Sequence, residues 1–392
     1  MKTVKTVMEP LYTNEKGDLL AAAGYRALAA RGSELLPAAD YIPLPKGATF
    51  TAMPGRAPLM QNREGKIVTG KGIAVAVLLP QGFSRMLLPA TKTLSEPEVL
   101  PLLGYTAAAM KDGKVYVAAK QTDEHKIWHP DHYNTADLPE RIAKVKKILP
   151  ENRIIDQLAH CSLIYGCFTA QNIFYRRWEG GLPVSKTCNA RCVGCISEQP
   201  AECCPSAQGR IGFSPTVKEI AEVGAFHLSG GKKENIISFG QGCEGEPSLE
   251  ADRIVKAMKV IRENTDQGTI NMNTNAGHRE CLQKIVDGGI DTLRVSLFSA
   301  NPAHYDAYYR PKNYAFEDVE RSLTYAVGHG VYVSLNLLAF PGFTDRAEEI
   351  EALCALISRT GLQKVQLRNL NIDADYFYIF WNSIYTSNIA FI

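Results

Sequence analysis

The sequence of 392 residues has no apolar run long enough to span a membrane, and its N-terminus lacks the continuous apolar segment of a secretory signal. We therefore expect no membrane association and a cytoplasmic location. A strong charge of either sign is also missing, since 43 basic residues face 41 acidic ones and the net charge is +2. This balance argues against a nucleic-acid partner, without excluding a local basic patch.

Internal repeats and low-complexity segments are absent too, which excludes repeat architectures and long disordered linkers. The chain is 45% hydrophobic and long enough to bury the cores of two domains. It does contain ten cysteines. In a reducing compartment, cysteines act as metal ligands or as small buried apolar residues more often than as disulfides.

The residue pattern divides the chain into four segments. Residues 1–137 contain short β-like runs separated by turns with glycine and proline, and we predict a β-rich N-terminal accessory domain. One helix is predicted inside it at residues 18–32, which are rich in alanine and leucine and stop at a glycine. Residues 138–181 are predicted to form a helical connector. The aromatic C-terminal tail, residues 372–392, either covers an open end of the fold, contacts another subunit or is an imperfect end of the chain.

Residues 182–371 alternate between strand-like and helix-like runs. Six apolar runs, from LPVS to KVQLRNLN, are predicted strands, and Ser214 followed by Pro215 is the expected start of the first helix. This alternation predicts an α/β fold with a parallel sheet of right-handed βαβ units. Six strands are fewer than the eight of a closed barrel, so an open partial barrel and a doubly wound sheet both fit.

Polar residues and glycines gather where five of the predicted strands end. They comprise the first cysteine-rich segment, residues 242–247, 273–275 and 296–299, and Asn336. The carboxyl ends of parallel strands meet at one edge of a sheet, where such folds carry their chemistry. We therefore predict a single active site at this edge.

The segment TCNARCVGC contains three closely spaced cysteines, Cys188, Cys192 and Cys195. Thiolates bind both zinc and iron–sulfur clusters. Cys203 and Cys204 follow shortly afterwards, and either of them could complete a structural zinc site. The local spacing alone leaves both kinds of site open.

The surrounding motifs resemble those of the radical SAM superfamily. The spacing Cys188-x-x-x-Cys192-x-x-Cys195, on the loop after the first predicted strand, is similar to the cysteine motif of that family. The sequence GQGCEGEP at residues 240–247 resembles its Gly-Gly-Glu-Pro type motif. TNAG after the third predicted strand and RVSL on the fourth also look familial. The resemblance covers about residues 182–371 and implies a partial (β/α)6 barrel.

The resemblance implies a [4Fe–4S] cluster in which three cysteines hold three irons and S-adenosylmethionine chelates the fourth. Reductive cleavage of S-adenosylmethionine would then give a 5′-deoxyadenosyl radical that abstracts hydrogen from a substrate. An electron donor such as flavodoxin or ferredoxin is implied as a partner. Because another thiolate would block the open iron, Cys203 and Cys204 should not be ligands of this cluster.

The same resemblance and the strand-end pattern predict the contacts to S-adenosylmethionine. Glycines allow a close backbone approach to the ligand, and a proline fixes the turn before the next helix. An asparagine in an apolar strand needs a polar partner if it is buried. The predicted cofactor-binding residues are Gly242, Gly245, Glu246, Pro247, Thr274, Ser296 and Asn336.

One position departs from the family pattern. The residue before the third cysteine is usually aromatic and packs near the adenine, whereas this chain has Gly194. We expect Ile196 or Phe239 to supply the adenine contact instead.

The other cysteines leave one question open. Cys161 and Cys167 could join Cys203 and Cys204 in an auxiliary cluster, although the spacing matches no known motif. Cys243, inside the glycine-rich loop, is interpreted as a small buried filler.

These observations predict a radical SAM enzyme that acts on an unidentified peptide or small metabolite. A second prediction within the superfamily is base modification in RNA. A third, from another class, is a zinc-stabilised binding module without enzymatic activity.

Overall fold

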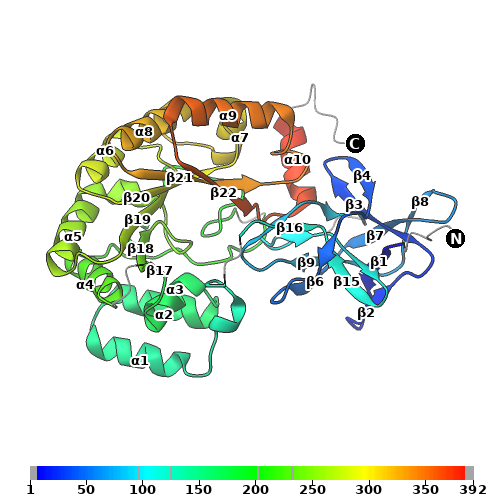
Figure 1. Cartoon of the computed structure of the whole chain (residues 1–392), viewed down its shortest axis with the longest axis horizontal. Coiled ribbons are helices and arrows are strands. Elements are labelled where there is room, and N and C mark those ends of the chain that lie inside the picture. The colour runs from blue at the N-terminus through cyan, green and yellow to red at the C-terminus, as the bar shows by residue number, and fades with distance from the viewer. Residues whose placement is uncertain (1–6, 95–97, 124–125, 201–202, 231–233, 385–392) are drawn as a thin grey trace.

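The structure is a computed structural model that describes residues 7–94, 98–123, 126–200, 203–230 and 234–384. A β-rich N-terminal part lies beside a mixed α/β part that holds the remaining chain (Figure 1). In these described ranges, no helix combines the length and the apolar character needed to cross a membrane.

The N-terminal part is built from antiparallel strands. One sheet has the order β13-β9-β1-β14-β15-β5 with β2 and β6 attached, a second has β11-β3-β7-β12 with β4 and β8 attached, and β10 pairs with β16. A short 3-10 helix, η1 (Pro130–His132), follows. The strands are β1 (Glu9–Thr13), β2 (Leu19–Ala21), β3 (Arg26–Arg31), β4 (Glu34–Pro37), β5 (Ile42–Pro43), β6 (Thr49–Met53), β7 (Arg56–Gln61), β8 (Ile67–Thr69), β9 (Ile73–Leu78), β10 (Phe83–Arg85), β11 (Leu88–Pro89), β12 (Thr91–Thr93), β13 (Tyr105–Thr106), β14 (Ala108–Lys111), β15 (Lys114–Val117) and β16 (Ala119–Gln121).

The helix predicted at residues 18–32 is wrong, because this stretch forms β2 and β3. Strand β3 pairs with β4, β7 and β11, and its residues Ala27 and Ala29 are almost completely buried. Small side chains allow the layers to approach closely here, and this packing overrides the helix propensity of alanine. Gly24 and Gly32 flank the strand with φ values of +84° and +62°.

Three helices lead from the N-terminal part to the parallel sheet, in agreement with the helical pattern of this segment. They are α1 (Leu138–Ile148), α2 (Arg153–Ile164) and α3 (Phe168–Tyr175). Asn152 caps α2 by accepting hydrogen bonds from the amides of Ile154 and Ile155.

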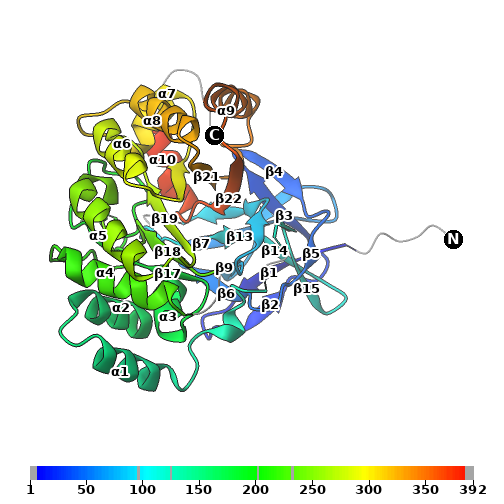
Figure 2. The ribbon, with the colours of Figure 1, turned by 60° about the vertical axis from the view of Figure 1, so that its left-hand side comes forward.

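The second part contains a curled sheet of six parallel strands arranged in chain order, with β17 and β22 at its edges (Figures 1 and 2). Helices between consecutive strands cover its outer face, as expected for βαβ units. The strands are β17 (Glu179–Gly181), β18 (Ile236–Phe239), β19 (Thr269–Thr274), β20 (Thr292–Leu297), β21 (Tyr332–Ala339) and β22 (Lys364–Asn369). The helices are α4 (Val217–Leu228), η2 (Pro247–Glu250), α5 (Ala251–Asn264), α6 (Arg279–Asp287), α7 (Pro302–Tyr309), α8 (Phe316–Gly328), α9 (Ala347–Thr360) and α10 (Ala374–Ile384).

The first strand and the first helix of this part begin at other residues than expected. Strand β17 ends before the predicted LPVS run, because the amides of Val184 and Ser185 bind the Glu244 carboxylate instead of a neighbouring strand. Helix α4 is capped by Thr216 rather than Ser214. Thr216 forms a capping box with Glu219, and this reciprocal pair sets the start of the helix.

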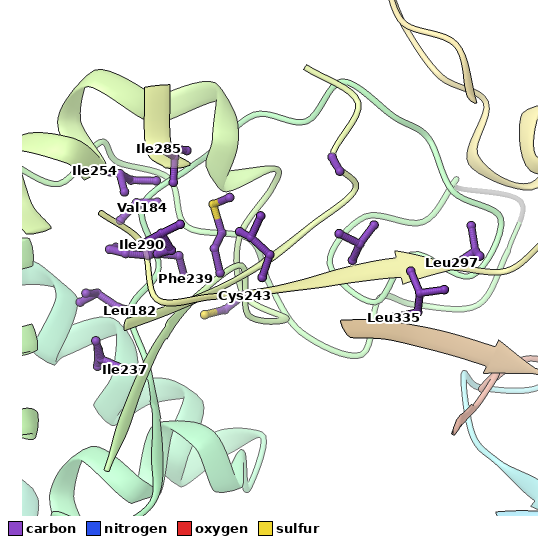
Figure 3. Close-up of a cluster of buried hydrophobic side chains, with 14 of the residues drawn as sticks. Leu182, Val184, Ile237, Phe239, Cys243, Ile254, Ile285, Ile290, Leu297 and Leu335 are labelled. Atoms are coloured by element: carbon purple, nitrogen blue, oxygen red, sulfur yellow. The ribbon is translucent and has the colours of Figure 1, made fainter. Parts of the chain in front are cut away.

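The two faces of the parallel sheet differ in polarity. Apolar side chains from the strands meet the helices on the outer face, where Ile237 and Phe239 are fully buried near Ile254 and Ile285 (Figure 3). The alternate residues point inward and are mostly polar, among them Ser238, Asn271, Asn273, Arg294, Ser296, Asn336 and Gln366. A parallel sheet buried on both faces is normally apolar on both. The polar inner face is therefore suited to bind a ligand.

The described part of the C-terminal tail forms α10, which packs into the core. Phe377 and Trp381 are almost completely buried. Trp381 stacks on Phe298, and Phe377 lies against Phe340 and Phe343, with ring centroids 4.2–5.8 Å apart. These partners follow β20 and β21, so α10 covers the carboxyl ends of these two strands. Residues 385–392 of the tail lie outside the described residues.

Two buried arginines fix the N-terminal part to the end of the sheet. The Arg56 Nη2 atom lies 2.6 Å from Asp373 Oδ2, and both side chains are only 2% exposed. Arg85 donates to the Leu370 carbonyl, and its amide donates to Asn369 Oδ1. The two parts are therefore held together by buried hydrogen bonds to the segment that follows β22.

Candidate active site

The three cysteines of the CxxxCxxC motif lie on the loop that follows β17. Hydrogen bonds from the Arg191 and Val193 amides to the carbonyls of Tyr309 and Tyr308 fix this loop to the end of α7. Burial, followed by the nearby Glu246 carboxylate, raises the pKa of Cys188 to about 11. Metal binding must displace the thiol proton, so we expect it to strengthen as the pH rises.

The donor set of this loop fits a cluster better than a single ion. Burial and then the neighbouring thiols Cys195 and Cys188 raise the pKa of Cys192, so the three sulfurs lie within one another's electrostatic reach. Yet in the part of the chain that the structure describes, no three Cys, His, Asp or Glu side chains converge tightly enough to hold one ion. The thiolates of an iron–sulfur cluster bind separate irons and need not meet at one point.

The glycine-rich loop after β18 packs directly against the cysteine loop. The Gly245 amide donates to the Ser185 carbonyl at 2.7 Å, and the Glu246 amide donates to the Thr187 carbonyl at 2.8 Å. A Cβ atom at Gly245 would lie 2.0 Å from the Thr187 oxygen. Only glycine allows this approach. The two motifs, separate in the sequence, thus form one continuous backbone surface.

Glu244 connects these two loops through its carboxylate, although the sequence motif indicated its neighbour Glu246 as the site residue. One carboxylate oxygen accepts the amides of Val184 and Ser185, and the other accepts those of Gly240 and Gln241, at 2.6–3.1 Å. Burial raises the pKa of Glu244 to about 7, against the opposite effect of these four donors. Its position between two strand ends follows from the fold and leaves no local signal.

Glu246 links the glycine-rich loop to the end of β19. Its carboxylate accepts hydrogen bonds from the Thr274 hydroxyl at 2.5 Å and from the amides of Asn275 and Ser248. Burial raises the pKa of Glu246, again opposed by these donors. Pro247 begins η2 immediately afterwards. The predicted residues Glu246, Pro247 and Thr274 therefore lie together at the carboxyl edge.

Ser296 and Asn336 occupy the inner face of the sheet, as neighbours in the register of β20 and β21. The Asn336 Oδ1 atom is buried and has no hydrogen-bond partner among the described residues. A buried acceptor without a donor is costly, so this atom is suited to receive a hydrogen bond from a ligand.

The position of Tyr308 explains why residue 194 is a glycine. A Cβ atom at Gly194 would lie 2.8 Å from the Tyr308 hydroxyl and 3.2 Å from Leu370 Cδ1. Tyr308 is 2% exposed and stacks on Phe298. An aromatic ring from α7 therefore fills the space beside Gly194. No local pattern in the sequence indicates this contact.

The two residues expected to contact adenine lie in different places. Ile196 is 40% exposed, and its Cδ1 atom would lie 2.6 Å from a Cβ atom at Gly242. It therefore stays available at the site. Phe239 is fully buried against the helices (Figure 3), so its ring cannot reach a ligand at the edge.

Arg210 is a further site residue that the sequence did not indicate. Its Nη2 atom lies 3.9 Å from Cys195 Sγ and 3.1 Å from the Ser197 hydroxyl. The Arg210 Nη1 atom also lies 2.7 Å from Glu198 Oε2, so this guanidinium connects several residues of the cysteine segment.

The remaining cysteines make two close sulfur contacts in the structure, and the auxiliary cluster stays a prediction. Cys161 is hydrogen-bonded to Cys243, and this contact lowers the pKa of Cys161 to about 7. Cys203 and Cys204 lie 3.7 Å apart, and Asp373 lies near Cys204. The two pairs have different surroundings, and Cys243 is a buried small residue as interpreted from the sequence.

Comparison with known families agrees with this site. The model of the radical SAM superfamily matches residues 182–357, which include the cysteine loop, the glycine-rich loop and strands β18 to β21. This match covers slightly less than half of the chain, and no subfamily is assigned.

Several solved structures are similar to this chain. They include anSMEcpe with bound AdoMet (14% identity, 49% of this chain and 51% of that chain, TM-score 0.38) and a radical SAM methyltransferase from Sphaerobacter thermophilus (16%, 54% and 64%, TM-score 0.39). SuiB from Streptococcus suis bound to S-adenosylmethionine is also similar (11%, 64% and 57%, TM-score 0.36). The matches span about half to two-thirds of each of those chains. A search of curated proteins finds no match.

Proposed function

We propose that this chain is a radical SAM enzyme whose Cys188, Cys192 and Cys195 bind a [4Fe–4S] cluster. The observation that supports this most is the direct packing of the cysteine loop on the glycine-rich loop, through Gly245 and Glu246. A loop with three thiols beside a glycine-lined surface suits a cluster and a ligand that share one iron.

In this proposal the cluster, when bound, supplies the electron that cleaves S-adenosylmethionine. The chain provides the surroundings. Gly242 and Gly245 let the glycine-rich loop pack closely on Ile196 and on the Thr187 backbone, which shapes the surface for the ligand, and Ile196 offers an apolar contact. Thr274 and Ser248 orient the Glu246 carboxylate through their hydrogen bonds. Asn336 offers its unpaired amide oxygen on the inner face.

The finer features of the sequence prediction belong to the same proposal. In this proposal the parallel sheet and its helices form a partial (β/α)6 barrel. An electron donor such as flavodoxin or ferredoxin reduces the cluster. The substrate is a peptide or a small metabolite, which gives up a hydrogen atom.

Anaerobic purification tests this function. We expect a brown protein with about four irons per chain that cleaves S-adenosylmethionine when reduced. The triple variant Cys188→Ala, Cys192→Ala, Cys195→Ala should lose both the iron and the cleavage. Cys354→Ala is the matched control, since Cys354 is exposed on α9. A colourless wild-type protein with stoichiometric zinc, or cleavage that persists in the triple variant, would contradict the assignment.

A further inference from the structure

A large cavity lies between the inner face of the parallel sheet and the N-terminal part. Its volume is about 960 Å³, and its walls include residues 79–83 and 122–123 together with inner residues of all six strands. This volume falls within the range of small-molecule sites, roughly 300–1,000 Å³. The polar inner face therefore has an opposite wall, and the space between them can enclose a ligand.

One cation in this cavity has no hydrogen-bond or ion-pair partner among the described residues. Arg368, on β22, is half-buried, and Arg294, Glu179 and Asp123 lie within its electrostatic reach. Its guanidinium makes no hydrogen bond or ion pair with any residue in the described ranges. Five N–H donors without acceptors in a partly desolvated space are costly. Among the described residues no carboxylate is paired with Arg368, so its donors are available to an anionic ligand in the cavity.

Arg294, another arginine at this cavity, has a carboxylate partner. Arg294 Nη1 lies 2.7 Å from Glu179 Oε1, and Glu179 also accepts the Ser238 hydroxyl at 2.6 Å. This carboxylate is thus already engaged by Arg294. Asp123 also has a partner. A third cation at the cavity, Lys364, forms no ion pair with a described residue.

The segment at the end of β22, residues 369–371, contacts both the cavity and the cysteine loop. Asn369 and Asn371 line the cavity. Leu370, between them, points the other way and would lie 3.2 Å from a Cβ atom at Gly194. Asn369 is held by the Phe83 carbonyl and the Arg85 amide of β10. The segment after β22 therefore contacts the cavity on one side and the cysteine loop on the other, whereas on β18 to β21 the cavity is lined by the amino-terminal halves of the strands.

We propose that this cavity binds a small anionic molecule whose carboxylate or phosphate group pairs with Arg368. Its size favours a metabolite over a folded partner. The proposal that an anion binds here depends only on the cavity and Arg368. The proposal that this anion is the substrate rests on the proposed radical SAM function. The N-terminal part then forms one wall of the substrate site.

Isothermal titration of the full-length chain with inorganic phosphate and with succinate tests this proposal. We expect at least one probe to bind, and the tighter one identifies the preferred anionic group. Arg368→Gln should weaken that binding about 10- to 100-fold, the cost of losing charge-assisted hydrogen bonds. Arg368→Lys keeps the charge but not the fork of donors and should fall between the two. Arg321→Gln, an exposed arginine on α8, is the matched control and should bind as the wild type does.

Two results would overturn the proposal: neither probe binds to the wild type, or Arg368→Gln and Arg368→Lys both bind as tightly as the wild type. Circular dichroism of each variant checks that it is folded, and Arg368→Lys carries the test if Arg368→Gln does not fold. Iron content and cleavage of S-adenosylmethionine are measured separately on the wild type. A failure of the radical SAM function is thereby distinguished from a failure of the anion site.

Discussion

The close packing of the two site loops makes a specific prediction for Gly245→Ala. The new Cβ atom would lie 2.0 Å from the Thr187 oxygen and 2.5 Å from its carbonyl carbon. Both are backbone atoms, so the cysteine loop itself must move by about 1 Å to reach an ordinary contact distance. This movement strains two backbone hydrogen bonds, from the Gly245 amide and from the Glu246 amide.

The expected destabilisation follows from these contacts. Each of the two hydrogen bonds is worth about 1 kcal/mol, and overpacking adds about 1–3 kcal/mol, so we expect a total of about 3–5 kcal/mol. For a chain of this size that loss lowers Tm by about 4–6 °C. The loop also carries Cys188, so iron binding should fall as well.

Gly328→Ala is the matched control. A Cβ atom at Gly328, in the last turn of α8, meets nothing within 4 Å. Alanine there should be neutral or slightly stabilising, by up to about 1 kcal/mol. Differential scanning calorimetry and iron analysis of both variants decide the matter. If Gly245→Ala keeps the wild-type Tm and iron content, the two loops do not pack as described.

Three further predictions concern other contacts. Gly194→Phe should destabilise the chain because its side chain overlaps the Tyr308 hydroxyl, and the double variant Gly194→Phe, Tyr308→Ala should recover part of the loss in thermal melts. Arg56→Met leaves Asp373 buried without its partner and should cost about 3–5 kcal/mol in urea unfolding, whereas an unchanged midpoint would refute a buried ion pair between the two parts. Burial lowers the pKa of His227 to about 4, so the unfolded chain takes up the proton first, and stability should fall as the pH drops from 6.5 to 4. His227→Gln should flatten this pH dependence.

The parallel sheet was predictable because each of its elements carries its own local pattern. Strands β18 to β22 and helices α5, α6, α8 and α9 lie where the alternation of apolar runs placed them. The polar residues at the strand ends were predictable for the same reason, since parallel strands bring their carboxyl ends to one edge. The errors occur where a tertiary contact overrides a local preference. In residues 18–32 the sheet pairing of β3 outweighs helix propensity, and at residues 182–185 a carboxylate replaces a neighbouring strand.

The site residues that the sequence missed share one property: each acts through a partner distant in the chain. Glu244 binds amides about 60 residues away, and Arg210 reaches Cys195 across a loop. Arg368 is unremarkable in the sequence, and only the fold shows that it lines a cavity. Single-sequence patterns report periodicity and short motifs, so contacts of this kind have no signal in them.

Gly194 shows how such a distant contact changes the meaning of a motif. Beside the third cysteine, an aromatic side chain on the loop and Tyr308 from α7 would occupy the same space, because a Cβ atom at Gly194 already meets the Tyr308 hydroxyl at 2.8 Å. The glycine is therefore a requirement of the packing, and the ring is supplied by another element. Tyr308 is in turn held by its stack on Phe298, which packs on Trp381 of α10. The aromatic C-terminal helix thus supports the cysteine loop through two intervening rings, so truncation before Trp381 should disturb iron binding as well as the fold.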